Sequence, residues 1–211
     1  MKAAWHLLGS QLARPHGVAG RLTGLLMRRL NREPYRLAIG ALQLRKDSRV
    51  LELGFGPGEG LAELLHQAKL GQVHGIDVSE TMFVQASMRN AGAISTGRIV
   101  LRLGDFAQLP YPDATFDRVL AVNVAYFWTD PAAMAAEIRR VLRPTGRVSL
   151  YVTERSSMEK WPFADRRTHR LFDAQDLSAM FTAAGFDDDA VRIRAVAPAR
   201  GVGGLVATAT A

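Results

Sequence analysis

Short apolar runs alternate with amphipathic stretches along most of the chain. The apolar runs, several of them bounded by Gly, Asn or Asp, are typical of buried strands. We predict these strands at 50–53, 73–78, 99–103, 116–122, 148–153, 191–196 and 205–208. Apolar positions at helical spacing predict helices at 60–69, 80–90, 131–142 and 173–184. This alternation of strand and helix predicts a doubly wound α/β sheet.

Two segments interrupt this alternation. Residues 1–48 carry apolar positions at helical spacing with arginines between them, and Pro34 suits the first turn of a helix. We predict that they form a helical cover or lid on a domain spanning 49–211. Helices packed on the sheet edge, or an interfacial helix on an anionic membrane, fit the same spacing. For residues 154–172, which are polar, we expect a loop and a short helix over one sheet edge.

The net charge of +7 belongs to the N-terminal segment. Residues 1–49 contain ten Lys or Arg and two acidic residues, whereas the remaining residues contain 17 basic and 18 acidic ones. This distribution disfavours nucleic acid as a partner of the domain body. It fits a weak association of the basic helix with a membrane surface.

The chain has 211 residues, of which 48% are hydrophobic and 22% charged, as is typical of one globular domain. No apolar run reaches the roughly 18 residues that span a bilayer, and residues 1–13 lack signal-peptide features. The absence of Cys excludes disulfides, thiolate metal sites and cysteine nucleophiles. No other metal-ligand spacing occurs, so we expect a cytoplasmic protein without a metal site, either a monomer or a homodimer.

Four glycines, Gly54, Gly56, Gly58 and Gly60, follow the first predicted strand. Such a turn lets the backbone approach a ligand closely. The pattern does not match the Gly-x-Gly-x-x-Gly of dinucleotide-binding proteins, because Glu59 stands at the third glycine position. Its negative charge would repel a pyrophosphate, which disfavours a nicotinamide oxidoreductase.

The stretch Glu52-Leu53-Gly54-Phe55-Gly56-Pro57-Gly58 resembles the first motif of class I S-adenosylmethionine-dependent methyltransferases. Four further segments resemble later motifs of this family, in the same order and spacing: 74–79, 104–106, 109–119 and 141–147. The resemblance covers half the chain and is closest to small-molecule methyltransferases of the quinone-biosynthesis type. It implies a Rossmann-like, seven-stranded, mostly parallel sheet with an antiparallel last strand and helices on both faces. It also implies S-adenosylmethionine as the cofactor and S-adenosylhomocysteine as the product.

The resemblance implies roles for individual residues. Gly54 and Gly56 would pack against the amino-acid end and the sugar of the cofactor, and Glu52 would hold its ammonium group. Asp77 would accept hydrogen bonds from both ribose hydroxyls. The implied cofactor-binding residues are Glu52, Gly54, Phe55, Gly56, Gly58, Asp77, Val78, Met82, Gly104, Asp105, Phe106 and Asn123.

The adenine and methionine ends of the cofactor have their own implied contacts. Asp105 would accept a hydrogen bond from the adenine amine, and the backbone amide of Phe106 would donate to a ring nitrogen. Met82 would cover the adenine face, a position that also fits the ordinary core. Asn123 would reach the methionine portion. Turn glycines and solvated carboxylates at strand ends are the simpler interpretation of the same residues.

The sequence does not identify a general base. Methyl transfer from a sulfonium is an in-line displacement to which positioning alone contributes ~7–11 kcal/mol. A base is needed only where the acceptor is a hydroxyl or a carbon acid. The candidates are His16, Tyr35, Tyr126, Trp128, Glu154 and His169.

These observations predict an enzyme that methylates oxygen, nitrogen or carbon of a small-molecule acceptor. Two alternatives remain. The basic N-terminal segment would suit an RNA or protein methyltransferase, and the missing base would suit a catalytically silent module that binds S-adenosylmethionine. The segment after Asn123 lacks the paired prolines of nucleic-acid amine methyltransferases, which disfavours methylation of a flipped base.

Overall fold

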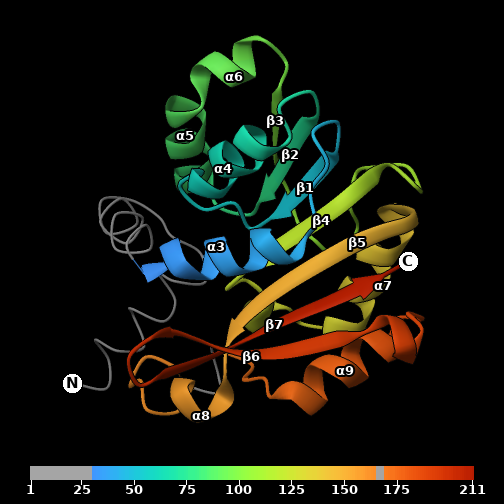
Figure 1. The fold of residues 1–211 in the computed structure, drawn as a ribbon. Coiled ribbons are helices and arrows are strands. Elements are labelled where there is room, and N and C mark those ends of the chain that lie inside the picture. The colour runs from blue at the N-terminus through green and yellow to red at the C-terminus, as the bar shows by residue number, and fades with distance from the viewer. Residues whose placement is uncertain (1–29, 165–168) are drawn as a thin grey trace.

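The computed structural model describes residues 30–164 and 169–211 (Figure 1). In these ranges the strands form one sheet with the order β3-β2-β1-β4-β5-β7-β6. They are β1 (Arg49–Leu53), β2 (Gln72–Asp77), β3 (Ile99–Leu103), β4 (Phe116–Val122), β5 (Leu142–Thr153), β6 (Arg192–Ala199) and β7 (Val202–Thr210). Strands β1 to β5 pair in parallel, and β7 runs antiparallel to β5 and β6. The predicted seven-stranded, mostly parallel sheet is confirmed.

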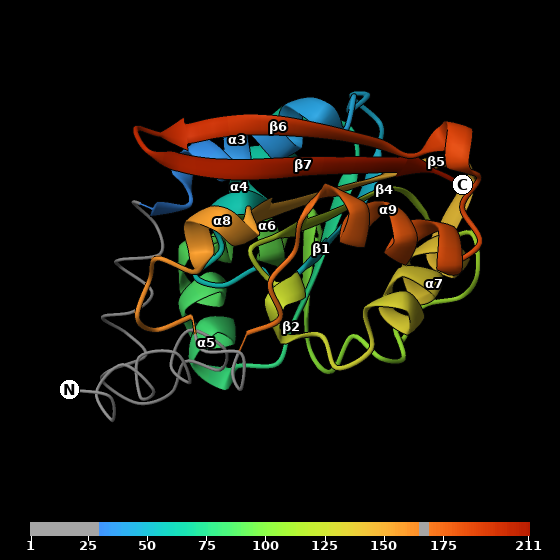
Figure 2. The same cartoon turned by 90° about the horizontal axis from the view of Figure 1, so that it is seen from below.

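Helices cover both faces of the sheet (Figures 1 and 2). Those described are α3 (Arg32–Ala41), α4 (Glu59–Gln67), α5 (Glu80–Arg89), α6 (Ala91–Ser95), η1 (Ala125–Phe127), α7 (Pro131–Val141), α8 (Arg155–Met158), α9 (Ala174–Ala183) and η2 (Asp188–Ala190). Buried side chains of α3, α4 and α5 form one core cluster, and those of α7 and α9 belong to another. Neighbouring residues of β1 divide between the clusters, Val50 facing the first and Leu51 the second, because side chains alternate along a strand.

The structure differs from the pattern-based prediction in several places. Strand β5 begins at Leu142 rather than Val148, and its pairing with β4 is irregular between Phe116 and Arg118. Thr145 has a left-handed backbone (φ 65°) in this irregular stretch, a conformation that favours glycine. The short helix α6 has no counterpart in the prediction. The predicted short helix after β5 is α8, which contacts β7 rather than an outer strand.

Helix α3 is fixed to the sheet at its C-terminal end. It packs against β4, β5 and β7, and Ala38 and Ile39 are buried in this contact. On β4, the guanidinium of Arg118 donates hydrogen bonds to the carbonyl oxygens of Leu42 (2.8 Å) and Gln43 (3.2 Å). The start of the predicted helical cover, residues 1–29, lies outside the described residues.

Replacing Arg118 tests this anchor. We expect Arg118→Met to lower the free energy of unfolding by about 1–3 kcal/mol, because the carbonyl of the buried residue Leu42 loses its donor. The control is Arg36→Met, which removes an exposed ion pair with Glu33 and should cost less than about 0.5 kcal/mol. Urea denaturation followed by circular dichroism measures both changes. An equal decrease in the free energy of unfolding in both variants would show that the Arg118–carbonyl contacts do not stabilise the fold specifically.

Candidate active site

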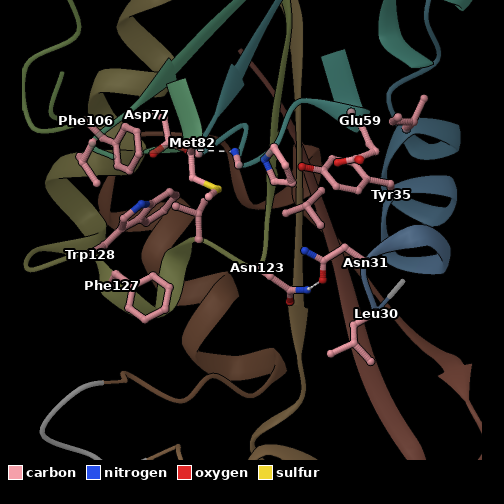
Figure 3. A pocket seen from close by; sticks show the side chains of 18 of the residues that line it. Leu30, Asn31, Tyr35, Glu59, Asp77, Met82, Phe106, Asn123, Phe127 and Trp128 are labelled. Carbon is pink, nitrogen blue, oxygen red and sulfur yellow. Dashed lines mark hydrogen bonds between the residues drawn. The ribbon is translucent and has the colours of Figure 1, made fainter. Parts of the chain in front are cut away.

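A cleft of about 2090 Å³ lies at the carboxyl ends of the central strands (Figure 3). It opens where the strand order reverses, between β1 and β4, which is where doubly wound sheets bind ligands. Its walls come from the glycine loop after β1, the ends of β2 and β4, the loop after β3, and helix α3. The central lining residues are Asn31, Tyr35, Gly54, Gly56, Gly60, Asp77, Val78, Met82, Asp105, Phe106, Asn123, Phe127 and Trp128.

The glycine loop requires glycines for two reasons. Gly54, Gly56 and Gly58 all have left-handed backbones, with φ of 68°, 51° and 88°. Two of them also leave no room for a side chain. A Cβ atom on Gly54 would lie 2.7 Å from Val124, and one on Gly58 would lie 2.9 Å from Ala86 of α5. Gly58 therefore serves the packing of α4 on α5 and does not line the cleft.

Asp77 ends β2 and holds the glycine loop. Its two carboxylate oxygens accept hydrogen bonds from the backbone N–H groups of Gly56 and Ser79, both at 2.9 Å. Burial raises the pKa of this carboxyl to about 6, although these N–H groups act in the opposite direction. The side chain lines the cleft, so its carboxylate is available to a ligand with hydroxyl donors.

Glu52 lies directly behind the cleft wall and is 1% exposed. One carboxylate oxygen, Oε1, accepts a hydrogen bond from the hydroxyl of Tyr35 at 2.7 Å. The other, Oε2, is buried without a hydrogen-bond partner among the described residues. Burial raises the pKa of Glu52 to about 8, the nearby Asp77 and Glu59 raise it further, and the Tyr35 hydrogen bond lowers it. This carboxyl would gain most from a cationic group of a ligand.

The opposite wall of the cleft is apolar. Met82, Phe106 and Trp128 lie close together there and face the cleft, as Figure 3 shows. Asp105 lies at the rim, where its Oδ1 accepts hydrogen bonds from the backbone N–H groups of Phe106 (2.6 Å) and Ala107 (3.1 Å). The Phe106 amide is thus paired within its own turn in this structure.

A chain of hydrogen bonds runs from β5 to the start of α3. The backbone N–H of Thr153 donates to the hydroxyl of Tyr126, which donates to Oδ1 of Asn123 at 2.8 Å. Nδ2 of Asn123 then donates to Oδ1 of Asn31 at 2.9 Å (Figure 3). The Asn123 oxygen accepts from Tyr126, and the Asn123 nitrogen donates to Asn31. These two hydrogen bonds fix the orientation of the Asn123 amide.

The structure brings most of the predicted cofactor-binding residues to the cleft. Those that line it are Gly54, Gly56, Asp77, Val78, Met82, Asp105, Phe106 and Asn123. Glu52 lies behind the wall, and Phe55 is fully buried in the core beneath Gly75. Gly58, which precedes α4, and Gly104, which follows β3, do not line the cleft.

Of the general-base candidates within the described residues, Tyr35 and Trp128 line the cleft, whereas three others do not: Tyr126, Glu154 and His169. The turn η1 points Tyr126 back toward β5, and burial raises the pKa of its hydroxyl. Glu154 lies against Gly203. His169 is buried against the ring of Phe127, with ring centroids 4.9 Å apart. His16 lies outside the described residues.

The pattern-based prediction assigned no cofactor role to the residues that α3 contributes. Asn31 and Tyr35 line the cleft and bind Asn123 and Glu52, respectively. The sequence identified Tyr35 only as a base candidate. Its contact with Glu52 could not be predicted, because the two residues are 17 positions apart along the chain. Its place at one end of a predicted amphipathic helix was the only available signal.

Comparisons with known proteins agree with this geometry. Residues 51–150 match a protein family described as methyltransferase domain. The chain is 29% identical over 177 residues to the uncharacterized methyltransferase YdaC of Bacillus subtilis (strain 168), covering 84% of this chain and 92% of that protein. It is 37% identical over 111 residues to the 27-O-demethylrifamycin SV methyltransferase of Amycolatopsis mediterranei (strain S699), covering 53% of this chain and 40% of that protein.

A methyltransferase of Haloferax volcanii, solved in complex with the activator Trm112, has the same fold. The TM-score is 0.79 at 20% identity, and the match covers 90% of this chain and 92% of that one. This chain belongs to the class I S-adenosylmethionine-dependent methyltransferases. Its cofactor is S-adenosylmethionine, and other structures with this fold hold S-adenosylmethionine or S-adenosylhomocysteine.

The similarity has limits in length. This methyltransferase spans 92% of the Bacillus relative but less than half of the next three curated relatives that it matches, at 40%, 31% and 45% of their lengths. Within residues 30–164 and 169–211, no helix is long and apolar enough to cross a membrane. The same ranges contain no group of three or more His, Asp or Glu placed to hold a metal ion.

The buried Glu52 makes the stability of the methyltransferase depend on pH. Its pKa of about 8 exceeds the usual 4.5, so the folded protein keeps a proton that the unfolded chain releases. The stability from this proton is complete at low pH and is lost as pH rises toward 8. We expect Glu52→Gln to match the wild type at pH 5 and to exceed its unfolding free energy by about 1–3 kcal/mol at pH 9.

Urea denaturation between pH 5 and pH 9 measures this difference. The control is Glu63→Gln on the exposed side of α4, for which we expect no pH-dependent difference from the wild type. A Glu52→Gln difference that stays constant across this range would contradict a protonated Glu52 in the folded protein.

Proposed function

We propose that this methyltransferase transfers a methyl group from S-adenosylmethionine to oxygen, nitrogen or carbon of a small-molecule acceptor. The observation that carries the proposal is the volume of the cleft. Its volume of about 2090 Å³ exceeds the roughly 300–1,000 Å³ typical of a site for one small ligand. This leaves room for a cofactor and a second molecule. The Amycolatopsis relative is itself named for a small molecule, 27-O-demethylrifamycin SV.

The cofactor is assigned to the end of the cleft near the glycine loop. Gly54 and Gly56 would approach it closely, and Asp77 would accept hydrogen bonds from the ribose hydroxyls. Asp105 would accept from the adenine amine, and Met82 would pack on the adenine face. Three features of this end support the assignment: a buried carboxylate oxygen without a partner among the described residues, a carboxylate in the cleft, and an apolar wall.

The acceptor is assigned to the end lined by α3 and η1. Phe127 offers a flat apolar face there, which suits a planar molecule. Asn123 connects the two ends, and its amide is held between Tyr126 and Asn31. The rigid amide would position the methionine portion of the cofactor relative to the acceptor.

When bound, S-adenosylmethionine supplies a methyl group on a sulfonium, which has a good leaving group. The residues of this chain therefore act by orienting the two molecules and by excluding water. Tyr126 does not serve as a base in this scheme, because its hydroxyl already donates to Asn123 and its pKa is raised by burial. The proposal fits acceptors that are nucleophilic without proton removal.

The role of Asp77 can be tested by binding. We expect Asp77→Asn to weaken S-adenosylhomocysteine binding by about 10- to 100-fold, because an amide offers one acceptor atom and no charge to the ribose hydroxyls. The control is Asp113→Asn, an exposed acidic residue that does not line the cleft and should leave the affinity unchanged. Isothermal titration calorimetry measures both, with circular dichroism to verify the fold. An unchanged affinity in Asp77→Asn would contradict the assignment.

The acceptor class can be tested with cofactor labelled in its methyl group. We expect the purified protein to transfer label to planar small molecules with a phenolate, enolate, amine or carboxylate group, because these groups are nucleophilic without a base from the protein. Total RNA and a protein extract serve as competing acceptors in parallel reactions. Label found only in RNA or protein would overturn the small-molecule assignment, and binding without transfer to any acceptor would indicate a silent module.

A further inference from the structure

Tyr35 links the N-terminal helix α3 to the first strand of the sheet. Its side chain projects from α3 into the cleft, as Figure 3 shows, and its hydroxyl donates to Oε1 of Glu52 at 2.7 Å. This side-chain contact joins α3 to Glu52, the penultimate residue of β1. A change in the position of α3 would therefore change the surroundings of Glu52.

Gly60 provides the space for this pair. It lies in the first turn of α4, where the helical backbone does not require glycine. A Cβ atom at this position would clash with Oε1 of Glu52 and with Cε1 of Tyr35. The glycine is thus explained by packing, and the packing partners are the two side chains that form the hydrogen bond.

The groups around Glu52 would not compensate a negative charge on its carboxylate. It faces Tyr35 from α3, Asp77 from β2 and Glu59 from α4. No Lys, Arg or His pairs with Glu52 in the described part of the chain, and its Oε2 has no hydrogen-bond partner there. A cation that approached this carboxyl from the cleft would be strongly favoured. The cofactor carries such a cation, its α-ammonium group.

We propose that Tyr35 is a positioning residue for cofactor binding. Its hydroxyl holds one carboxylate oxygen of Glu52, and the other oxygen then binds the α-ammonium group of the cofactor. Through this hydrogen bond, α3 sets the pH range in which the cofactor binds. The inference rests on the proposed assignment of the cofactor to the glycine-loop end of the cleft. It adds a role for α3 that the cofactor assignment does not itself require.

The proton balance follows from the same contacts. In the protein without ligand at neutral pH, the Glu52 carboxyl keeps its proton, because burial raises its pKa to about 8. Pairing with an ammonium group requires the carboxylate, so this proton passes to solvent on binding. The pKa of Tyr35 is raised well above its usual value, so its hydroxyl remains a donor throughout. Its hydrogen bond stabilises the carboxylate and so favours release of the proton.

Removal of the Tyr35 hydroxyl should shift the pH profile of binding. If Tyr35→Phe raises the pKa of Glu52 by about one unit, the dissociation constant for S-adenosylhomocysteine should increase about tenfold at pH 7 and only about twofold at pH 9. Titration calorimetry in buffers of different ionisation enthalpy should also show proton release that persists to higher pH in the variant. The amino group of the ligand titrates in this range too, but its effect is common to both proteins and cancels in the ratio.

Two comparisons separate this role from a structural one. Tyr111→Phe removes a buried hydroxyl outside the cleft, and it should leave the pH profile unchanged. The ligand 5′-methylthioadenosine has no amino-acid portion, so Tyr35→Phe should bind it as the wild type does at every pH. In the Glu52→Gln background, Tyr35→Phe should cause no pH-dependent loss, because the titrating group is gone.

The outcomes distinguish the two proposals. If the wild type binds S-adenosylhomocysteine and Tyr35→Phe has the same profile, this inference is overturned while the cofactor assignment stands. A loss that is equal at pH 7 and pH 9, and that extends to 5′-methylthioadenosine, would show that Tyr35 is only structural and would also overturn it. If the wild type fails to bind S-adenosylhomocysteine at any pH, both proposals fail.

Discussion

The hydrogen bond between the Gly56 backbone and the Asp77 carboxylate determines the shape of the site. It joins the loop after β1 to the end of β2, and it requires a left-handed backbone that glycine adopts without strain. The start of α4 follows from this loop, and with it the position of Gly60 beside Glu52. One contact between neighbouring strands thus fixes the loop, the next helix and the buried carboxyl behind the cleft.

The part of the structure that could be predicted from sequence is the part with local causes. Apolar runs predicted the strands, and the glycines with Asp77 predicted residues that line one end of the cleft. The contacts of Asn31 and Tyr35 could not be predicted, because their partners Asn123 and Glu52 are distant in sequence. Titratable residues near strand ends did not predict which side chains line the cleft, because the direction of a single turn decides whether such a side chain reaches it. The turn η1 directs Tyr126 to β5 while its neighbours Phe127 and Trp128 line the cleft.

The arginines of the domain body explain how a basic chain can have an acidic site. Arg118 binds the carbonyls that end α3, and Arg98 binds those of Ala68, Lys69 and Gly71 after α4. Arg140 likewise binds the carbonyls of Leu109 and Tyr111. These three guanidinium groups donate to backbone carbonyls, and Arg140 also pairs with Glu137 and Asp113, so none of them pairs with Glu52 or Asp77. Glu52 and Asp77 therefore have no Lys or Arg partner among the described residues, and their carboxyl groups can interact with a ligand.

Asn123 shows how the chemistry of the cleft limits the residues that evolution can use. Its left-handed backbone (φ 55°) favours glycine, whereas its position in the hydrogen-bond chain requires an amide with both a donor and an acceptor. Asparagine is the residue type that meets both demands, since it tolerates this backbone better than other side chains do. Glycine at this position would relax the backbone but break the hydrogen-bond chain, and most other side chains would strain the backbone. Sequence drift here should be narrow even where the acceptor changes.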